Sequence, residues 1–306
     1  MRVTALAGGT GAAKLLRGLA ACLAAPDLTI IGNTGDDTEV WGLHVSPDLD
    51  TVVYALAGRL DVARGWGRAE ETFHCLEAMA ALGAPSWFAL GDRDLATHLV
   101  RTASLRAGEP LSAVTARLAA RLGLTARVLP MSDDPVRTVV DTTQGRLSFQ
   151  EYFVRDRAAG DVVAVDYLGA PVARPGPGVL AAITEADLVV VCPSNPVTSV
   201  GPILAVPGIA AALAVARMVV GISPIVGGAP VSGPAGRLMR ARGLEVSPLG
   251  VATAYAPWLR ALLIDSRDRG AAPRLERAGV RAVVAEVVMT DPSRELALAR
   301  QVLEAT

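Results

Sequence analysis

Short apolar runs alternate with helical patterns over much of the chain. Residues 3–7 and 28–31 form apolar or β-branched runs, and leucines at helical spacing lie between them. This order predicts a strand–helix–strand unit, the first part of a parallel sheet. The alternation returns from residue 179 to about residue 290. We therefore expect an α/β fold with a doubly wound, mostly parallel, Rossmann-like sheet.

The middle of the chain follows a different pattern. Its first part has mainly helical spacing, and its last part contains short β-like pieces. We expect a single domain over residues 1–306, with a core at about 1–50 and 179–290 and a helical and small-β insertion at about 51–178. Such insertions often cover the ligand crevice at the carboxyl ends of the strands.

A glycine-rich loop follows the first predicted strand. Gly8, Gly9, Thr10 and Gly11 precede a helical pattern that contains Lys14, the single lysine of the chain. Glycines let the backbone approach an anion closely, and the start of a helix offers free N–H groups. The loop has neither the Gly-Lys-Ser/Thr of a P-loop nor the third glycine of a dinucleotide loop. We predict a phosphate cradle, with a plain strand-to-helix turn as the alternative.

Polar residues also follow two other predicted strands. Asn33 and Asp36 follow the second strand, and Ser194, Asn195 and Ser199 follow an apolar run further along the chain. The carboxyl ends of parallel strands meet at one edge of a sheet, so these residues should face the glycine loop. The segment 222–236 repeats the pattern of the later loop, and two such loops facing the glycine loop favour a long polyanionic ligand such as a nucleoside diphosphate. A helix cap at Asp36 and a plain turn at the later loop are the alternatives.

Carboxylates gather at two predicted helix starts. Asp48 and Asp50 lie two positions apart, and such a pair can reach one hard cation where the backbone is still irregular. Mg²⁺ commonly uses one or two carboxylates together with substrate phosphate oxygens. A helix N-cap is the alternative for either residue. Asp92 and Arg93 start a second segment, for which a solvated ion-pair cluster is the alternative.

Composition excludes some classes of partner. The chain has a net charge of −1 and so lacks the excess of basic residues that is typical of nucleic-acid binding proteins. The longest apolar stretch, residues 203–222, is interrupted by Pro207 and Gly208 and contains Arg217, so we expect no membrane span. The three cysteines are odd in number and lack zinc spacing, which favours a reducing compartment. We therefore predict a cytoplasmic protein.

A series of short motifs occurs in a specific order from Val3 to about Asp268. They are GGTGAAKLLRGL, NTGDD, SPDLDTVVYALAG, GWG, LGDRDLATH, PMSDDPVRT, FQEYFV, PSNPVTSVGPIL, SPIVGGAPVSGPAG and GVATAY. Together they resemble the 2-phospho-L-lactate transferase (CofD) family of deazaflavin coenzyme biosynthesis. The sequence departs from that pattern at Ala12 and Ala13, where many relatives carry Gly or Thr-Pro before the lysine.

The resemblance implies a transferase. It would move a 2-phospho-L-lactate or phosphoenolpyruvate-type group from a guanosine-diphosphate-activated donor to the ribityl hydroxyl of the deazaflavin Fo, and release GMP. It implies Mg²⁺ as cofactor, a homodimer, and a functional link to the guanylyltransferase that makes the donor. Trp66 and Trp87 could pack on the deazaflavin ring or belong to the core.

Matching the motifs of the family assigns roles to the acidic residues. Asp48 is expected to hold the magnesium ion, with Asp50 beside it. Asp50 is also expected to hold the ribityl chain of the acceptor or to activate its hydroxyl. Asp92 and Arg93 are expected to meet the acceptor or the leaving phosphate.

Two other classes of protein share a glycine loop. A nicotinamide dehydrogenase would end its second strand in an acidic residue, where this chain has Asn33. A non-catalytic nucleotide-sugar-binding regulator of the gluconeogenesis-factor family shares the GGTG opening. That family is not expected to carry SPDLDT or LGDRDLATH.

Overall fold

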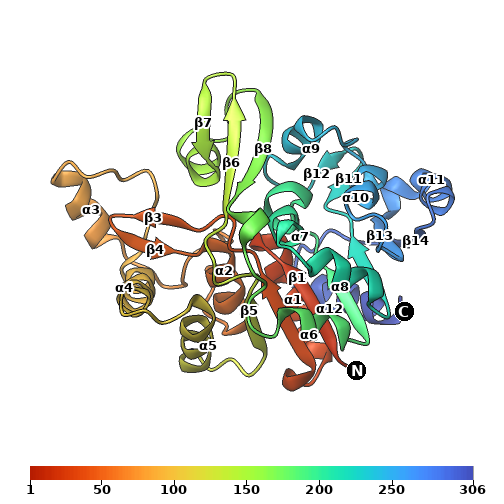
Figure 1. The fold of residues 1–306 in the computed structure, drawn as a ribbon, viewed down its shortest axis with the longest axis horizontal. Coiled ribbons are helices and arrows are strands. Elements are labelled where there is room, and N and C mark those ends of the chain that lie inside the picture. The colour runs from red at the N-terminus through yellow and green to blue at the C-terminus, as the bar shows by residue number, and fades with distance from the viewer. Residues whose placement is uncertain (306) are drawn as a thin grey trace.

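A seven-stranded sheet forms the centre of the molecule (Figure 1). The structure is a computed structural model that describes residues 1–305. The strand order is β14-β13-β10-β9-β1-β2-β5, and every neighbouring pair is parallel. The strands of this sheet are β1 (Val3–Ala7), β2 (Leu28–Gly32), β5 (Arg127–Pro130), β9 (Leu188–Val191), β10 (Val219–Ile222), β13 (Ala261–Asp265) and β14 (Arg281–Ala285). The predicted fold class is confirmed.

The remaining strands form three small antiparallel sheets. Their members are β3 (Thr38–Val40) with β4 (Leu43–Val45), β6 (Arg137–Thr142) with β7 (Gly145–Ser148) and β8 (Val162–Leu168), and β11 (Ile225–Val226) with β12 (Ala229–Pro230). The α-helices are α1 (Gly9–Cys22), α2 (Pro47–Leu56), α3 (His74–Ala81), α4 (Asp92–Arg106), α5 (Leu111–Arg121), α6 (Val179–Thr184), α7 (Gly201–Ala205), α8 (Ile209–Val215), α9 (Ala235–Ala241), α10 (Pro248–Ala254), α11 (Ala272–Arg277) and α12 (Pro292–Glu304). Short 3₁₀ or π turns are η1 (Ala25–Asp27), η2 (Glu151–Arg155), η3 (Ala170–Val172), η4 (Pro196–Val200) and η5 (Ser266–Ala271).

The two faces of the central sheet bury separate apolar clusters. Successive side chains of a strand point to opposite faces, so Leu6 joins one cluster while Ala5 and Ala7 join the other. On the second face, α1 and α12 contribute Leu19 and Leu298. Helices α6 and α8 contribute to the first cluster in the same way. Both faces are therefore covered by helices, which explains why the strands read as continuous apolar runs in the sequence.

The strand order reverses between β1 and β9. From β1, the chain adds β2 and β5 on one side and β9, β10, β13 and β14 on the other. The chain therefore leaves the carboxyl ends of β1 and β9 in opposite directions along the sheet. Doubly wound proteins bind ligands in the crevice at such a point. A reciprocal contact joins the two loops that follow these strands. The Gly8 N–H donates to Ser194 Oγ (3.3 Å), which in turn donates to the Gly8 carbonyl oxygen (2.8 Å).

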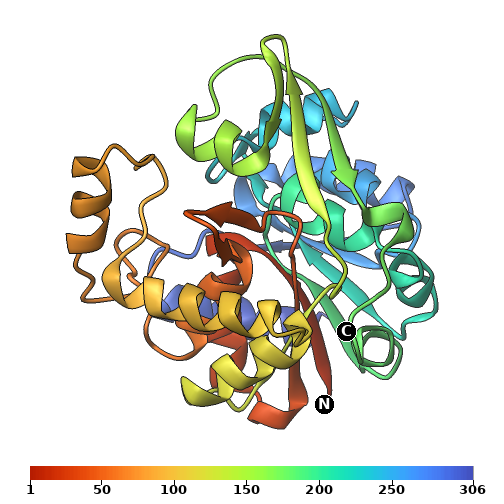
Figure 2. The ribbon, with the colours of Figure 1, turned by 60° about the vertical axis from the view of Figure 1, so that its left-hand side comes forward.

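The predicted insertion is less continuous than its range of 51–178 suggests. Strand β5 lies in that range but pairs with β2 as the edge of the central sheet. A short apolar strand next to a helical segment gives little sign of which sheet it joins. Figures 1 and 2 show α3 projecting on one side of the molecule, and the β6–β7–β8 sheet above the central strands.

The apolar stretch at 203–222 contains the end of α7, then α8 and β10. Within residues 1–305, no single helix has both the length and the apolar character to cross a membrane. Pro196–Ala205 and Ile209–Val215 meet those criteria only as a pair, and the pair is bent by 91°.

Candidate functional site

A cavity of about 400 Å³ lies at the point where the strand order reverses. It is lined by every predicted nucleotide-binding residue except Asn33, together with Asp48. These lining residues are Gly8, Gly9, Thr10, Gly11, Lys14, Asp36, Asp48, Ser194, Asn195 and Ser199. We call this cavity the glycine-loop pocket.

The glycine loop fits closely against its neighbours. A Cβ on Gly8 would overlap Asp48 Oδ2 and lie 2.7 Å from the Ser199 Cβ, and a Cβ on Gly11 would overlap the Pro193 carbonyl oxygen. Gly9 has a φ of +70°, in the left-handed region that favours glycine. These positions require glycine for geometric reasons. They also leave the first backbone amides of α1 close to the pocket.

The loop after β9 forms another wall of the pocket. Asn195 Oδ1 accepts a hydrogen bond from the Val197 N–H (3.0 Å) and so caps η4. Lys14, which also lines the pocket, donates from Nζ to the Met289 carbonyl oxygen (3.0 Å). Because Lys14 and the glycine loop line the same pocket, the ammonium group is close enough to the loop to pair with a bound phosphate.

Asp48 is a buried carboxylate that lines the pocket. It lies in the first turn of α2, which begins at Pro47, and it is 7% exposed. Asn33 Nδ2 donates to Asp48 Oδ2 (2.8 Å). Burial raises the pKa of Asp48 to about 7, and the hydrogen bond from Asn33 only partly offsets this. Within residues 1–305, no Lys, Arg or His pairs with it.

Asp36 is a second buried carboxylate in the same pocket. It is 5% exposed, and its Oδ1 has no hydrogen-bond partner among the described residues. Burial, and then the charge of Asp48, raise the pKa of Asp36 well above its usual range. A pocket with two uncompensated carboxylates fits a divalent cation. Within residues 1–305, no three His, Cys, Asp or Glu side chains are placed to share an ion, so phosphate oxygens and water would complete the shell.

Asn33 holds Asp48 rather than lining the pocket. It is fully buried, and its Nδ2 also donates to the Thr198 carbonyl oxygen (3.1 Å). Its Oδ1 accepts from the Gly35 N–H (2.8 Å). Because both ends of the amide are engaged, the expected contact of Asn33 with a nucleotide is not supported. The side chain instead joins the end of β2, the start of α2 and η4.

Asp50 does not share the environment of Asp48. Two positions along a helix correspond to a turn of about 200°, so the two carboxylates leave α2 on opposite sides. Asp50 forms a bidentate ion pair with Arg101 of α4, with Arg101 Nη1 3.0 Å from Asp50 Oδ2. Asp50 is absent from the lining of the pocket. The two carboxylates therefore lie in different surroundings, and the cation site shared by Asp48 and Asp50 stays a prediction.

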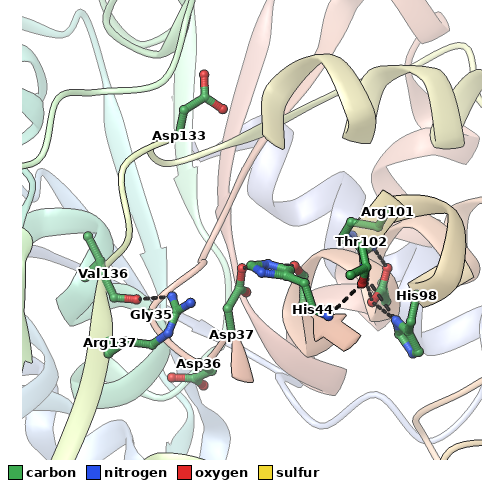
Figure 3. A network of polar contacts seen from close by, with 12 residues as sticks. Gly35, Asp36, Asp37, His44, His98, Arg101, Thr102, Asp133, Val136 and Arg137 are labelled. Atoms are coloured by element: carbon green, nitrogen blue, oxygen red, sulfur yellow. Dashed lines mark hydrogen bonds and ion pairs between the residues drawn. The ribbon is translucent and has the colours of Figure 1, made fainter. Parts of the chain in front are cut away.

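A buried polar network continues beyond Asp50. His98 Nε2 lies 3.3 Å from Asp94 Oδ1, and Asp94 Oδ1 accepts from the Tyr54 hydroxyl (2.7 Å). Figure 3 shows Arg101 beside His98, with Thr102 next to His44. The His44 N–H donates to Thr102 Oγ1 (2.8 Å). This network fastens α4 to α2 and to the β3–β4 hairpin.

Asp92 and Arg93 lie at the start of α4, outside the pocket lining. Asp92 Oδ2 accepts from the Thr72 hydroxyl (2.6 Å) and from the His74 N–H (3.1 Å). Arg93 Nη1 pairs with Glu70 (3.0 Å). Both side chains organise the segment that leads into α3. Their expected meeting with the acceptor or the leaving phosphate is therefore not supported by their position.

Two aromatic residues of the pocket were not predicted. Phe149 and Phe153 line it, with ring centroids 5.4 Å apart and planes at 6°. Their spacing of four residues in the FQEYFV segment is the signal that could have indicated them. Trp66 is 43% exposed, and neither it nor Trp87 lines the pocket.

Fold and site together define a doubly wound α/β protein with a glycine loop and two buried carboxylates around one pocket at the point where the strand order reverses. Residues 3–303 match the family described as 2-phospho-L-lactate transferase CofD. The chain belongs to this family, and it is a transferase.

Named relatives cover nearly the whole chain. A phosphoenolpyruvate transferase from Streptomyces griseus is 50% identical, covering 99% of this chain and 98% of its own. A 2-phospho-L-lactate transferase from Methanosarcina acetivorans is 46% identical, with 95% of each chain covered. A solved structure of a UPF0052 family protein from Bacillus halodurans has a TM-score of 0.65 at 18% identity, covering 99% of this chain and 100% of that one. The last similarity concerns the fold alone.

Proposed function

We propose that the protein transfers a phospho-hydroxy-acid group from a guanosine-diphosphate-activated donor to the ribityl hydroxyl of the deazaflavin Fo. GMP is released, and the product belongs to coenzyme F420 biosynthesis. The observation that carries the proposal is the glycine-loop pocket, in which a phosphate cradle faces the buried carboxylates of Asp48 and Asp36. Family membership supports the same reaction class.

The proposed reaction is a direct in-line displacement at phosphorus, in which the residues of the pocket have separate roles. Amides of the glycine loop and Lys14 bind the diphosphate and neutralise its charge. Asp48 is the carboxylate that would hold Mg²⁺, which supplies charge neutralisation on the phosphate oxygens. Asn33 fixes the orientation of Asp48 through its 2.8 Å hydrogen bond.

Asp36 is the proposed proton acceptor. Its buried Oδ1, which has no hydrogen-bond partner among the described residues, suits a group that takes the proton of the ribityl hydroxyl. The hydroxyl oxygen then bonds to phosphorus as the bond to the GMP oxygen breaks. No covalent enzyme intermediate is required. The stacked pair Phe149 and Phe153 offers a flat apolar wall to the deazaflavin ring.

The donor acid is proposed from the relatives. Relatives named phosphoenolpyruvate transferase reach 51% identity, and those named 2-phospho-L-lactate transferase reach 46%. We therefore favour an enolpyruvyl donor over a lactyl donor. We also propose a cytoplasmic homodimer that receives its donor from a guanylyltransferase.

A product assay tests this proposal. Purified protein is incubated with Fo, Mg²⁺ and, in separate reactions, the lactyl, enolpyruvyl and glyceryl guanosine-diphosphate donors. Mass spectrometry should then show GMP together with Fo carrying the phospho-acid, formed fastest from the enolpyruvyl donor. Nucleotide binding without turnover from any donor would contradict the proposal and favour a nucleotide-sugar-binding regulator.

A further inference from the structure

A second cavity adjoins the glycine-loop pocket. It measures about 450 Å³ and lies between α9, the β11–β12 hairpin and the segment that follows η2. Phe153, Gly233 and Pro234 line both cavities. A ligand that occupies one cavity therefore lies next to the other. We call this second cavity the arginine pocket.

The arginine pocket is positively charged. Arg157, Arg237 and Arg240 line it, and its lining contains no Asp or Glu. Within residues 1–305, Arg157 and Arg240 have no carboxylate partner. The nearby carboxylates of Glu151 and Asp156 pair instead with Arg155, at 2.7 and 2.8 Å. Three guanidinium groups thus line one hollow without an internal counter-ion.

The backbone beneath these arginines is held in an uncommon conformation. Arg157 and Ala158 are consecutive non-glycine residues with φ of +52°. The Ala158 N–H donates to the Tyr152 carbonyl oxygen (2.7 Å), and the Arg237 guanidinium donates to the Ala158 carbonyl oxygen. Left-handed residues other than glycine are rare and concentrate at ligand sites. This turn fastens the segment that carries Arg157 to α9, which carries the other two arginines.

We propose that the arginine pocket is an anion subsite that binds a phosphate or carboxylate group. Guanidinium groups bind such anions through paired N–H donors, and one group here is already oriented by a backbone carbonyl. The anion has two possible sources. It is either the far end of a ligand seated on the glycine loop, or a separate small anion. The inference concerns charge and shape alone, so it does not depend on the transfer reaction proposed above.

Inorganic phosphate is the probe for this site. Its affinity for the full chain is measured by calorimetry, first alone and then with GDP at saturation. The test variant is the double substitution Arg157→Gln and Arg240→Gln. The matched control is Arg300→Gln, which removes an exposed arginine of α12 that lines neither cavity. Thermal unfolding confirms that each variant is folded.

The proposal predicts phosphate binding that weakens at least tenfold in the double variant and does not change in Arg300→Gln. If phosphate still binds when GDP is saturating, the site takes a separate anion. If GDP displaces phosphate and the double variant also binds GDP more weakly, the site takes the far end of the nucleotide ligand. Equal phosphate and GDP affinities in the wild type and the double variant would overturn the proposal. Failure of the transfer reaction would appear only in the product assay.

Discussion

Helix α2 carries two buried aspartates, Asp48 and Asp50, whose electrostatic surroundings are opposite. Asp48 points into the glycine-loop pocket, where burial raises its pKa to about 7 and no cationic side chain compensates it. Asp50 points toward α4, where Arg101 forms a bidentate pair with it. An uncompensated buried charge costs stability, and a paired one is held in place. This difference in surroundings is the basis of our proposal that Asp48 meets a ligand, whereas the contacts of Asp50 join α2 to α4.

The largest expected effect comes from Asp48→Asn. The amide keeps the shape of the side chain but cannot supply the charge that holds a cation, so turnover should fall roughly a thousandfold. Steady-state kinetics with Fo and saturating Mg²⁺ measures this. Asp50→Asn is the matched control, since it makes the same change two positions along α2. A variant at position 48 with near-normal turnover would refute the role of Asp48.

The next effect is on stability and comes from Asp50→Asn. This substitution leaves the Arg101 guanidinium buried without its partner, which should cost about 3–5 kcal/mol of unfolding free energy. Urea unfolding measures the loss, and the double substitution Asp50→Leu with Arg101→Met should recover most of it. Turnover of the folded fraction should change little. If the variant kept full stability but lost turnover, Asp50 would instead act in the transfer reaction.

A smaller, pH-dependent effect separates the wild type from Asp48→Asn. The pKa of Asp48 is about 7 in the folded protein and near 3.8 when unfolded, so the folded state binds the proton more tightly between these values. Wild-type stability relative to the variant should therefore rise as pH falls from about 7 to 4, by at most about 1.4 kcal/mol per pH unit. Urea unfolding in EDTA at several pH values measures it. A flat difference would contradict the raised pKa.

The smallest expected effect concerns the aromatic wall of the pocket. Phe153→Leu removes one face of the stacked pair, and KM for the acceptor should rise about fivefold with kcat nearly unchanged. Trp66→Leu is the control, because Trp66 does not line the pocket. Equal KM values for the two variants would show that the ring binds elsewhere.

Some of these features can be predicted from the sequence and others cannot. The glycine loop and the polar residues after β9 are local signals at strand ends, and the parallel sheet brings such ends together. The different fates of Asp48 and Asp50 depend on Arg101, a partner some fifty residues away that no local pattern indicates. The contacts of Asp92 could not be predicted for a similar reason, because its partner Thr72 lies in a separate segment.

The central claim is that Asp48, and not Asp50, faces the bound cation. Calorimetric titration of Mg²⁺ into the GDP-bound protein tests it directly, with Asp48→Asn and Asp50→Asn compared at a temperature where both are folded. We expect Asp48→Asn to lose cation binding and Asp50→Asn to retain it. Cation binding that survives in Asp48→Asn and disappears in Asp50→Asn would contradict the account.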